Sequence, residues 1–201
     1  MIFEERTYKN IHYVVYIPNQ RAIKKNRVIL HLHGTGARGN NIELIKNIKM
    51  FEYALKTNGE FPYIIVSPQC FADSWFDIFE QLQDFVKFVE KEYNVEDYFI
   101  AGYSMGAYTS WQLIQTLPDM FKKGILCCGG GAYWSFGRIK TEVFSYHGTA
   151  DKRVPLEENK KMVDLVNEHG GKAHLTLFSG VEHNCWDRVY LDENTYKQLE
   201  D

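Results

Sequence analysis

The chain has 201 residues, of which 45% are hydrophobic and 24% are charged, and its formal net charge is −3. This length and composition predict one soluble domain over residues 1–201, with enough apolar side chains for a full core. A slightly acidic chain lacks the basic surface that nucleic acid or an anionic membrane requires, so neither is expected as a partner.

The sequence also lacks the signs of a membrane or secretory segment. It contains no long uninterrupted apolar run, so no transmembrane helix is predicted. Its first residues include two acids and no apolar stretch, unlike a signal peptide, although a trimmed signal stays open. The cysteines follow no metal spacing and are too sparse for a disulfide framework, so we expect buried, reduced thiols in a cytoplasmic protein. The four are Cys70, Cys127, Cys128 and Cys185.

The first half of the chain is predicted to be rich in strands. Its first two apolar segments alternate with polar residues, which predicts an antiparallel hairpin, and the next two are apolar runs typical of buried strands. An apolar stripe at three- and four-residue steps then predicts a helix over 79–93. The four strands are expected at residues 3–8, 11–17, 27–33 and 62–67.

The second half alternates predicted strands and helices. The strands are expected at residues 97–101, 124–128, 142–146 and 172–178, and the helices at 105–117, 154–168 and 194–199. Pro155 falls in the first turn of one helix, and Gly170 follows its end. A hairpin followed by this alternation predicts a three-layer α/β/α sandwich around a mostly parallel, twisted sheet. Ligands of such sheets bind at the carboxyl ends of the strands.

One of these strand ends carries Gly102-Tyr-Ser-Met-Gly106. Gly-x-Ser-x-Gly arises easily by chance, but a strand before it and a helix after it are the setting of a nucleophile elbow. In that sharp turn the serine backbone is strained, and side chains at both glycine positions would collide with neighbouring backbone. The alternative is an ordinary strand–helix turn with Ser104 as the N-cap. The context favours Ser104 as a nucleophile.

A serine hydroxyl needs a base, and the base needs a group that orients it. Asp151 lies just after the strand predicted at 142–146, and His183 lies just after the strand predicted at 172–178. Ser104, Asp151 and His183 therefore follow three strands, in the chain order that a nucleophile elbow requires. We expect them to meet at one sheet edge, where the N–H of Met105 would face a developing oxyanion.

The sequence contains four motifs at the predicted active edge: HLHGTG at 31–36, GYSMG at 102–106, HGTADKRVP at 147–155 and GVEHNCW at 180–186. Together they resemble the α/β-hydrolase superfamily over nearly the whole chain. Within it, the chain is similar to small serine esterases without a cap domain: the carboxylesterase and dienelactone-hydrolase-like group, with feruloyl-esterase and polyhydroxybutyrate-depolymerase-like relatives. The resemblance implies Ser104 as nucleophile, His183 as base, Asp151 as acid, the Thr35 N–H as second oxyanion donor, and no cofactor. Serine in place of the cysteine of dienelactone hydrolases disfavours that particular activity.

Aromatic residues make up 15% of the chain, and several fall in loops at the predicted active edge. Aromatic faces suit a flat acyl group or a sugar ring, although loops also use aromatic residues simply for packing. We expect four of them to bind substrate: Trp75, Trp186, Trp134 and Tyr103.

Other chemically notable residues are expected to be structural. His31 and His33 share one strand face, but no further ligand follows at metal spacing, so no metal site is predicted. Cys185 follows the predicted base closely, but the elbow presents a serine, so a buried or pocket-wall thiol is expected. Residues 129–131 are three glycines without the Lys-Ser/Thr of a phosphate loop, which favours a tight loop beneath the substrate.

These residues lead to the hypothesis of a serine hydrolase that cleaves carboxylic esters through an acyl-enzyme. Short acyl, acetyl or hydroxycinnamoyl esters are expected, because a chain of this length leaves little room for a lid. A small ester is the expected partner, and the oligomeric state stays open, a homodimer included. A serine peptidase of the same fold is one alternative, and a binding protein with an inactive triad is another, of a different class.

Overall fold

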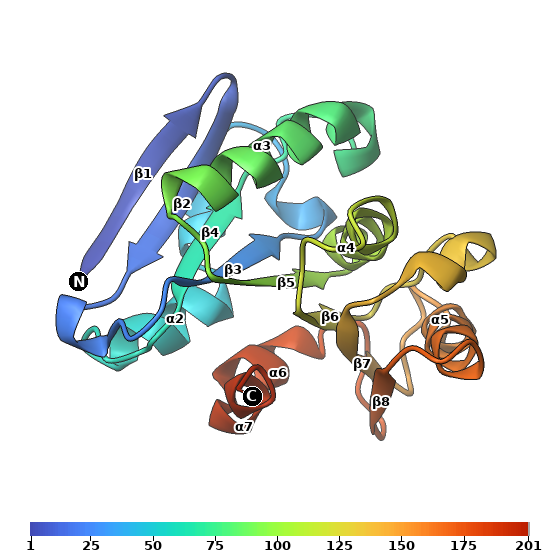
Figure 1. Ribbon diagram of the computed structural model, residues 1–201. Helices are drawn as coiled ribbons and strands as arrows, with labels where there is room; N and C mark the ends of the chain where they lie inside the picture. Colours follow the sequence, from blue (N-terminus) through green and yellow to red (C-terminus); the bar gives the residue numbers. More distant parts are fainter. Residues whose placement is uncertain (201) are drawn as a thin grey trace.

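The computed structural model describes residues 1–200, and Figure 1 shows its helices on both sides of a twisted central sheet. The strand order across this eight-stranded sheet is β1-β2-β4-β3-β5-β6-β7-β8. The strands β1 and β2 form the predicted antiparallel hairpin, β2 pairs antiparallel with β4, and β3 to β8 run parallel to one another. The predicted mostly parallel α/β sandwich is therefore confirmed.

All eight strands lie where apolar runs or alternation predicted them, with shifts of one or two residues at their ends. Pairing extends β5 up to the residue before Ser104 and β7 through Gly148. The strands are β1 (Ile2–Tyr8), β2 (Ile11–Ile17), β3 (Arg27–Leu32), β4 (Ile64–Pro68), β5 (Asp97–Tyr103), β6 (Lys123–Cys127), β7 (Glu142–Gly148) and β8 (Ala173–Phe178).

The helices divide between the two faces of the sheet, and Figure 1 shows α3, α4 and α5 on one side and α2, α6 and α7 on the other. The first group consists of α3 (Phe79–Glu92), α4 (Met105–Thr116) and α5 (Leu156–Glu168). The second group consists of α1 (Glu43–Lys46), α2 (Lys49–Lys56), α6 (Trp186–Leu191) and α7 (Glu193–Lys197). Four short 3₁₀ segments complete the fold: η1 (Gln20–Ala22), η2 (Thr35–Ala37), η3 (Trp75–Ile78) and η4 (Tyr133–Arg138).

Each helical layer buries an apolar stripe against its face of the sheet. The predicted stripe of α3 packs into one core, where Leu82, Phe85 and Val89 are fully buried. On the opposite face, Phe51 of α2 and Tyr190 of α6 are buried in the second core. Burying one such side chain stabilises the fold by about 1.5–3 kcal/mol. The two helical layers therefore hold the sheet in place from both faces.

The structure adds three short α-helices to the predicted pattern and shifts the start of another. Helices α1, α2 and α6 were not predicted, because each is a short segment of at most 8 residues. Helix α5 begins at Leu156 rather than at Val154, so Pro155 is its N-cap instead of a residue of its first turn.

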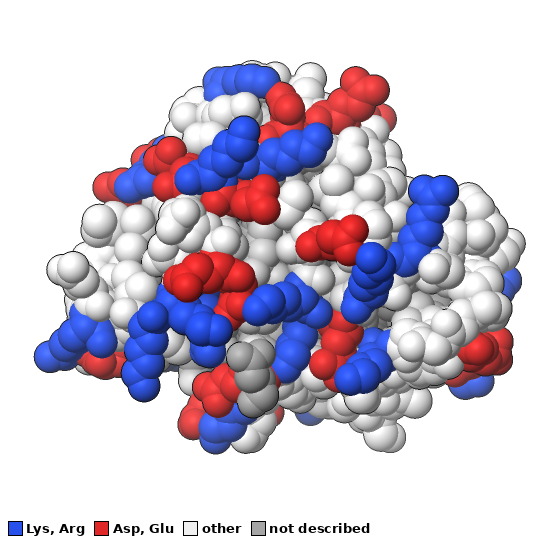
Figure 2. Space-filling view, viewed as in Figure 1, with Lys and Arg blue, Asp and Glu red and all other residues white. Residues whose placement is uncertain are grey.

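The described residues include no helix with the length and apolar character needed to cross a membrane. On the face that Figure 2 shows, acidic and basic side chains are interspersed, in keeping with the net charge of −3.

Candidate active site

The turn between β5 and α4 places Ser104 in a strained conformation. Its φ is 52° and its ψ is −124°, a region that non-glycine residues rarely occupy. A Cβ at Gly102 would lie 2.6 Å from the carbonyl oxygen of Gly106, and a Cβ at Gly106 would lie 2.0 Å from that of Leu32. Both glycines are therefore needed so that α4 can start close to the sheet, as the elbow interpretation predicted.

Ser104 meets the two residues predicted from distant parts of the sequence. Its Oγ lies 3.0 Å from Nε2 of His183, and Nδ1 of His183 lies 2.7 Å from Oδ2 of Asp151. The Asp151 side chain is fully buried and that of His183 is 13% exposed. With a proton on Nδ1 directed at the carboxylate, Nε2 is left to accept the serine proton.

The Asp151 carboxylate is held ionised by three hydrogen-bond donors, the ring of His183 and two backbone N–H groups of its own loop. Oδ1 accepts hydrogen bonds from the N–H groups of Arg153 (2.8 Å) and Val154 (3.0 Å). Burial alone would raise the pKa of this carboxyl. The hydrogen bonds from His183, Val154 and Arg153 outweigh the burial and hold the pKa below the ordinary aspartate value. The carboxylate is therefore charged and fixed where the imidazole needs it.

A second histidine, His147, supports the same carboxylate. Asn159 Nδ2 donates to His147 Nδ1 over 3.1 Å, which leaves the proton on Nε2. That Nε2 lies 3.1 Å from the carbonyl oxygen of Val154 and 3.3 Å from Oδ2 of Asp151. Sequence reasoning gave His147 only a general structural role. His147 lies one residue before the end of β7 and four residues before the predicted acid. That position was the signal that could have placed it beside the Asp151 carboxylate.

The two predicted oxyanion donors flank the serine. A Cβ at Gly34 would lie 3.2 Å from Cβ of Ser104, so the loop after β3 passes directly beside the nucleophile. Within residues 1–200, neither the Thr35 N–H nor the Met105 N–H donates a hydrogen bond to another protein group. Free N–H groups beside a nucleophile can accept a developing negative charge. The predicted assignment of Thr35 and Met105 stays a prediction that this arrangement supports.

Trp75 does not line an open surface, which corrects the prediction that it binds substrate. Its side chain is 0% exposed, and its indole N–H donates to the carbonyl oxygen of His33 over 3.1 Å. His33 in turn donates from Nδ1 to Gly34 O (2.7 Å) and accepts from the Cys70 N–H at Nε2 (3.0 Å). Burial lowers the pKa of His33 to about 4, so the ring stays neutral. Trp75 and His33 together brace the loop that carries Thr35.

Trp186 lies next to His183, and Tyr103 lies next to Trp186. The Trp186 ring is 5.2 Å from that of His183 and nearly perpendicular to it, and Tyr103 stacks on Trp186 at 4.4 Å. Trp134 lies in η4, where its ring contacts Tyr133 and is 74% exposed. A role in substrate binding stays a prediction for these three residues.

A cluster of thiols lies beneath the histidine loop. Cys128 Sγ lies 2.9 Å from Cys185 Sγ and donates to the carbonyl oxygen of His183 over 3.0 Å. Hydrogen bonding to Cys185 and burial both raise the pKa of Cys128, so its thiol keeps the proton. All four cysteines are buried and free, as predicted.

Three potential metal-ligating atoms, from Cys128, His147 and Asp151, lie within 4.8 Å of one another. His147 Nε2 already carries the proton that it directs at Val154, and the Cys128 thiol is protonated. Metal ligation requires a deprotonated thiol and a free imidazole nitrogen. Cys128 and His147 therefore fit a hydrogen-bonded packing role beside the carboxylate better than a metal site.

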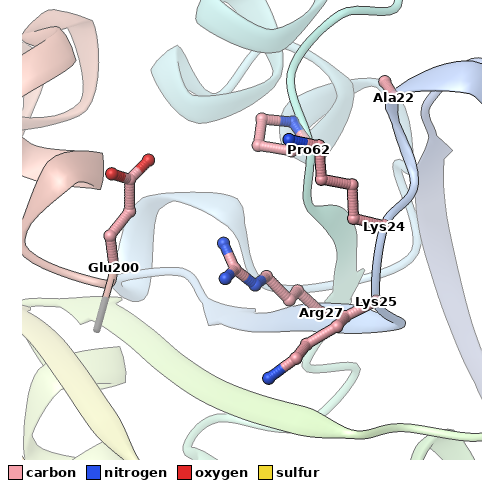
Figure 3. A pocket seen from close by; sticks show the side chains of 6 residues that line it. All are labelled: Ala22, Lys24, Lys25, Arg27, Pro62 and Glu200. Carbon is pink, nitrogen blue, oxygen red and sulfur yellow. The ribbon is translucent and has the colours of Figure 1, made fainter.

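Two hollows lie at opposite ends of the parallel strands. One, of about 590 Å³, is lined partly by His183 and Trp186. The other, of about 410 Å³, is lined by Lys24, Lys25 and Arg27 with Glu200 across the opening (Figure 3). Arg27 begins β3 and pairs in register with the first residue of β5, whereas Ser104 follows the last residue of that strand. The second hollow is therefore remote from the serine.

No family model matches the chain, and no curated protein does either. Solved structures do match it. A thermostable esterase superposes with a TM-score of 0.81 at 25% identity, covering 98% of this chain and 62% of that one. Est1E from Butyrivibrio proteoclasticus superposes at 0.75 with 13% identity and covers 98% of both chains. An acylaminoacyl peptidase from Pyrococcus horikoshii superposes at 0.68 with 16% identity, covering 98% of this chain and 41% of that one.

The chain therefore has the α/β-hydrolase fold, the fold of the superfamily that its four sequence motifs resemble. It spans about three fifths of the length of the thermostable esterase. Two of these structural neighbours are named as esterases and one as an acylaminoacyl peptidase.

Proposed function

We propose that the protein is a serine hydrolase that cleaves carboxylic esters through an acyl-enzyme. The observation that carries the proposal is the continuous hydrogen-bonded series from Ser104 through His183 to Asp151, with the serine on a strained elbow. A serine hydroxyl gains nucleophilic strength only when a positioned base takes its proton. Neither of the two distances in the series exceeds an ordinary hydrogen bond.

In the proposed acylation, Ser104 Oγ attacks the ester carbonyl carbon while His183 Nε2 takes the hydroxyl proton. The Asp151 carboxylate stabilises the imidazolium that forms. The N–H groups of Thr35 and Met105 stabilise the oxyanion, and loss of one such donor costs roughly 3–4 kcal/mol of barrier. The carbon–oxygen bond to the alcohol then breaks, and His183 delivers its proton to the departing oxygen.

In deacylation, His183 removes a proton from water, and the resulting hydroxide equivalent attacks the acyl carbon. The second tetrahedral intermediate collapses, the proton returns to Ser104, and the carboxylic acid leaves. Every proton in the cycle moves through His183 Nε2, so this chain supplies all the groups that the two steps require.

Short acyl, acetyl or hydroxycinnamoyl esters are the proposed substrates. The groove of about 590 Å³ beside His183 is open, and Trp186 offers an aromatic ring at its wall. One structural neighbour, Est1E, has been solved with ferulic acid bound, which makes feruloyl esters the first aromatic candidates to assay. A peptidase is the second candidate, supported by the acylaminoacyl peptidase match. That peptidase superposes less closely than the thermostable esterase, with a TM-score of 0.68 against 0.81, which ranks amide cleavage lower.

The test replaces the proposed nucleophile. Ser104→Ala is expected to lower the hydrolysis of p-nitrophenyl acetate by about 10⁴-fold or more and to prevent labelling by a fluorophosphonate probe. The control is Ser179→Ala, an exposed serine outside the series, which should keep both. A panel of acyl lengths, methyl ferulate and an acylated dipeptide would then rank substrates. Unchanged activity in Ser104→Ala would reject the assignment, and labelled protein without ester turnover would favour the peptidase.

A further inference from the structure

The groove beside His183 is lined by more positive than negative side chains. It is formed by the loop after β8 and the first turn of α6, together with one residue of the loop that carries the Asp151 carboxylate. Two of the side chains that line it are arginines from different loops, Arg153 and Arg188. One carboxylate, that of the exposed Glu182, also lines it. The lining therefore carries two guanidinium groups against one acid.

Both guanidinium groups are available to a ligand. In the described part of the chain, Arg6, Arg21 and Arg27 form ion pairs with carboxylates, whereas Arg153 and Arg188 form none. A guanidinium is planar, permanently charged and shaped to bind a carboxylate through two parallel hydrogen bonds. Two of them in one groove therefore favour an anionic ligand group.

The chemistry of the proposed reaction says which part of the substrate occupies this groove. His183 Nε2 protonates the departing oxygen, so the alcohol part of the ester must lie next to the imidazole at the moment of cleavage. His183 itself lines the groove, and Trp186 beside it offers a ring face. The acyl part stays attached to Ser104 and to the oxyanion donors. The groove is thus placed to receive the leaving group.

We propose that the protein prefers esters whose alcohol part carries a carboxylate, which Arg153 and Arg188 bind while Trp186 contacts the adjoining ring or chain. The proposal rests on the proposed function and specifies its substrate class. The reaction remains ester hydrolysis: Ser104 takes the acyl group, the carbon–oxygen bond breaks, and an anionic hydroxy acid leaves with the proton from His183. The Arg153 side chain is distinct from its backbone N–H, which holds Asp151, so the side chain can be changed alone.

The test compares two matched esters, 4-acetoxybenzoate and the neutral 4-acetoxybenzamide. The native protein is expected to prefer the anionic ester, and added salt should weaken that preference by screening the exposed charges. Arg153→Gln and Arg188→Gln should each reduce kcat/KM for 4-acetoxybenzoate by about five- to tenfold, with little change for the amide-bearing ester. For each variant, the ratio of kcat/KM for the two esters is compared with the same ratio for the native protein. This comparison cancels the difference in intrinsic reactivity between the esters.

The matched control is Arg138→Gln, an exposed arginine of η4 outside this groove, which should leave the ratio unchanged. Equal losses for both esters in the Arg153 and Arg188 variants, or a ratio that does not move, would overturn the proposal. A binding readout separates this outcome from failure of the proposed function. Ser104→Ala should bind 4-hydroxybenzoate more tightly than 4-hydroxybenzamide, and Arg188→Gln in the same background should remove that difference whether or not any ester is cleaved.

Discussion

At the scale of single residues, the site depends on which atoms of Asp151, His147 and His183 carry a proton. Asp151 is charged because His183 and two backbone N–H groups direct their protons at it, in spite of its burial. His147 Nε2, whose proton is directed at the Val154 carbonyl oxygen, lies 3.3 Å from the same carboxylate oxygen. This arrangement leaves His183 with one protonated and one basic nitrogen, the state that general-base catalysis needs.

Asp151→Asn tests that arrangement. The amide group of asparagine can donate to Nδ1, which would leave the histidine proton on Nε2, facing Ser104, in the wrong tautomer for a base. We expect kcat for p-nitrophenyl acetate at neutral pH to fall by about 10³–10⁴-fold with the fold intact by circular dichroism. Asp164→Asn, a change at a half-exposed surface ion pair of α5, serves as the control and should behave as the native protein. A loss of less than tenfold would show that the carboxylate does not set the tautomer.

Order along the chain was enough to predict which distant residues meet, but it could not predict how a single side chain packs. Ser104, Asp151 and His183 could be found because each follows an apolar strand and the fold brings such strand ends together. Trp75 was misassigned for a physical reason: a loop position at the active edge does not say which way the ring points. The indole reaches inward to the His33 carbonyl oxygen, a contact that only the folded loop reveals.

At the scale of elements, the close approach of α4 to β3 positions Ser104, the proposed nucleophile. Gly106 lies where a Cβ would be 2.0 Å from the carbonyl oxygen of Leu32, a backbone atom that cannot move aside cheaply. Ser110 Oγ also returns a hydrogen bond to the Gly106 carbonyl over 2.8 Å, which ties the first turn together. The backbone of α4 therefore packs directly against the backbone of β3, with no side chain between them. The sharp turn that this packing requires strains the backbone at Ser104.

Gly106→Ala should separate the two elements. The added methyl group must push α4 away from β3, and overpacking of this kind costs about 1–3 kcal/mol or more. We expect lower stability in urea unfolding together with a loss of activity larger than the fraction of unfolded protein explains, because the helix carries the Met105 N–H. Gly137→Ala, where a Cβ meets no atom within 4 Å, is the matched control. Equal stability of the two variants would contradict this account of the elbow.

Element prediction worked for the strands and the long helices because their patterns extend over many residues. The stripe of α3 continues for 14 residues, and all eight strands show apolar runs or alternation. The 8-residue α2 and 6-residue α6 were missed, since one or two turns give too few repeats to distinguish a helix from a loop. Their helical state depends on packing against each other beneath the sheet, which is a tertiary contact.

At the scale of the whole molecule, buried neutral histidines link stability to pH. His31 is fully buried between the rings of Tyr103 and Tyr190, and its Nδ1 lies 3.1 Å from Ser67 Oγ. Its Nε2 has no hydrogen-bond partner among the described residues. Burial, with a smaller effect of the neighbouring His33, lowers the pKa of His31 from 6.5 to about 3.

The sign of the effect follows from proton binding. The pKa of His31 is lower in the folded protein than in the unfolded chain, so below pH 6.5 the unfolded chain binds a proton that the folded protein excludes. Acid therefore draws the equilibrium toward unfolding. The contribution of His31 to stability is complete above pH 6.5 and declines steadily as the pH falls toward about 3.

His31→Phe removes this linkage while keeping an aromatic ring in the core. At pH 7.5 the variant should be about as stable as the native protein, because it also removes a buried nitrogen without a partner. Between pH 6 and pH 4.5, its free energy of unfolding should fall less steeply, by up to about 1.4 kcal/mol per pH unit, the value for one proton. Urea unfolding at a series of pH values measures the slope, with His12→Phe, at an exposed histidine, as the control. Parallel slopes for the native protein and His31→Phe would mean that His31 takes up its proton in the folded state, and that its surroundings open in acid before the molecule unfolds.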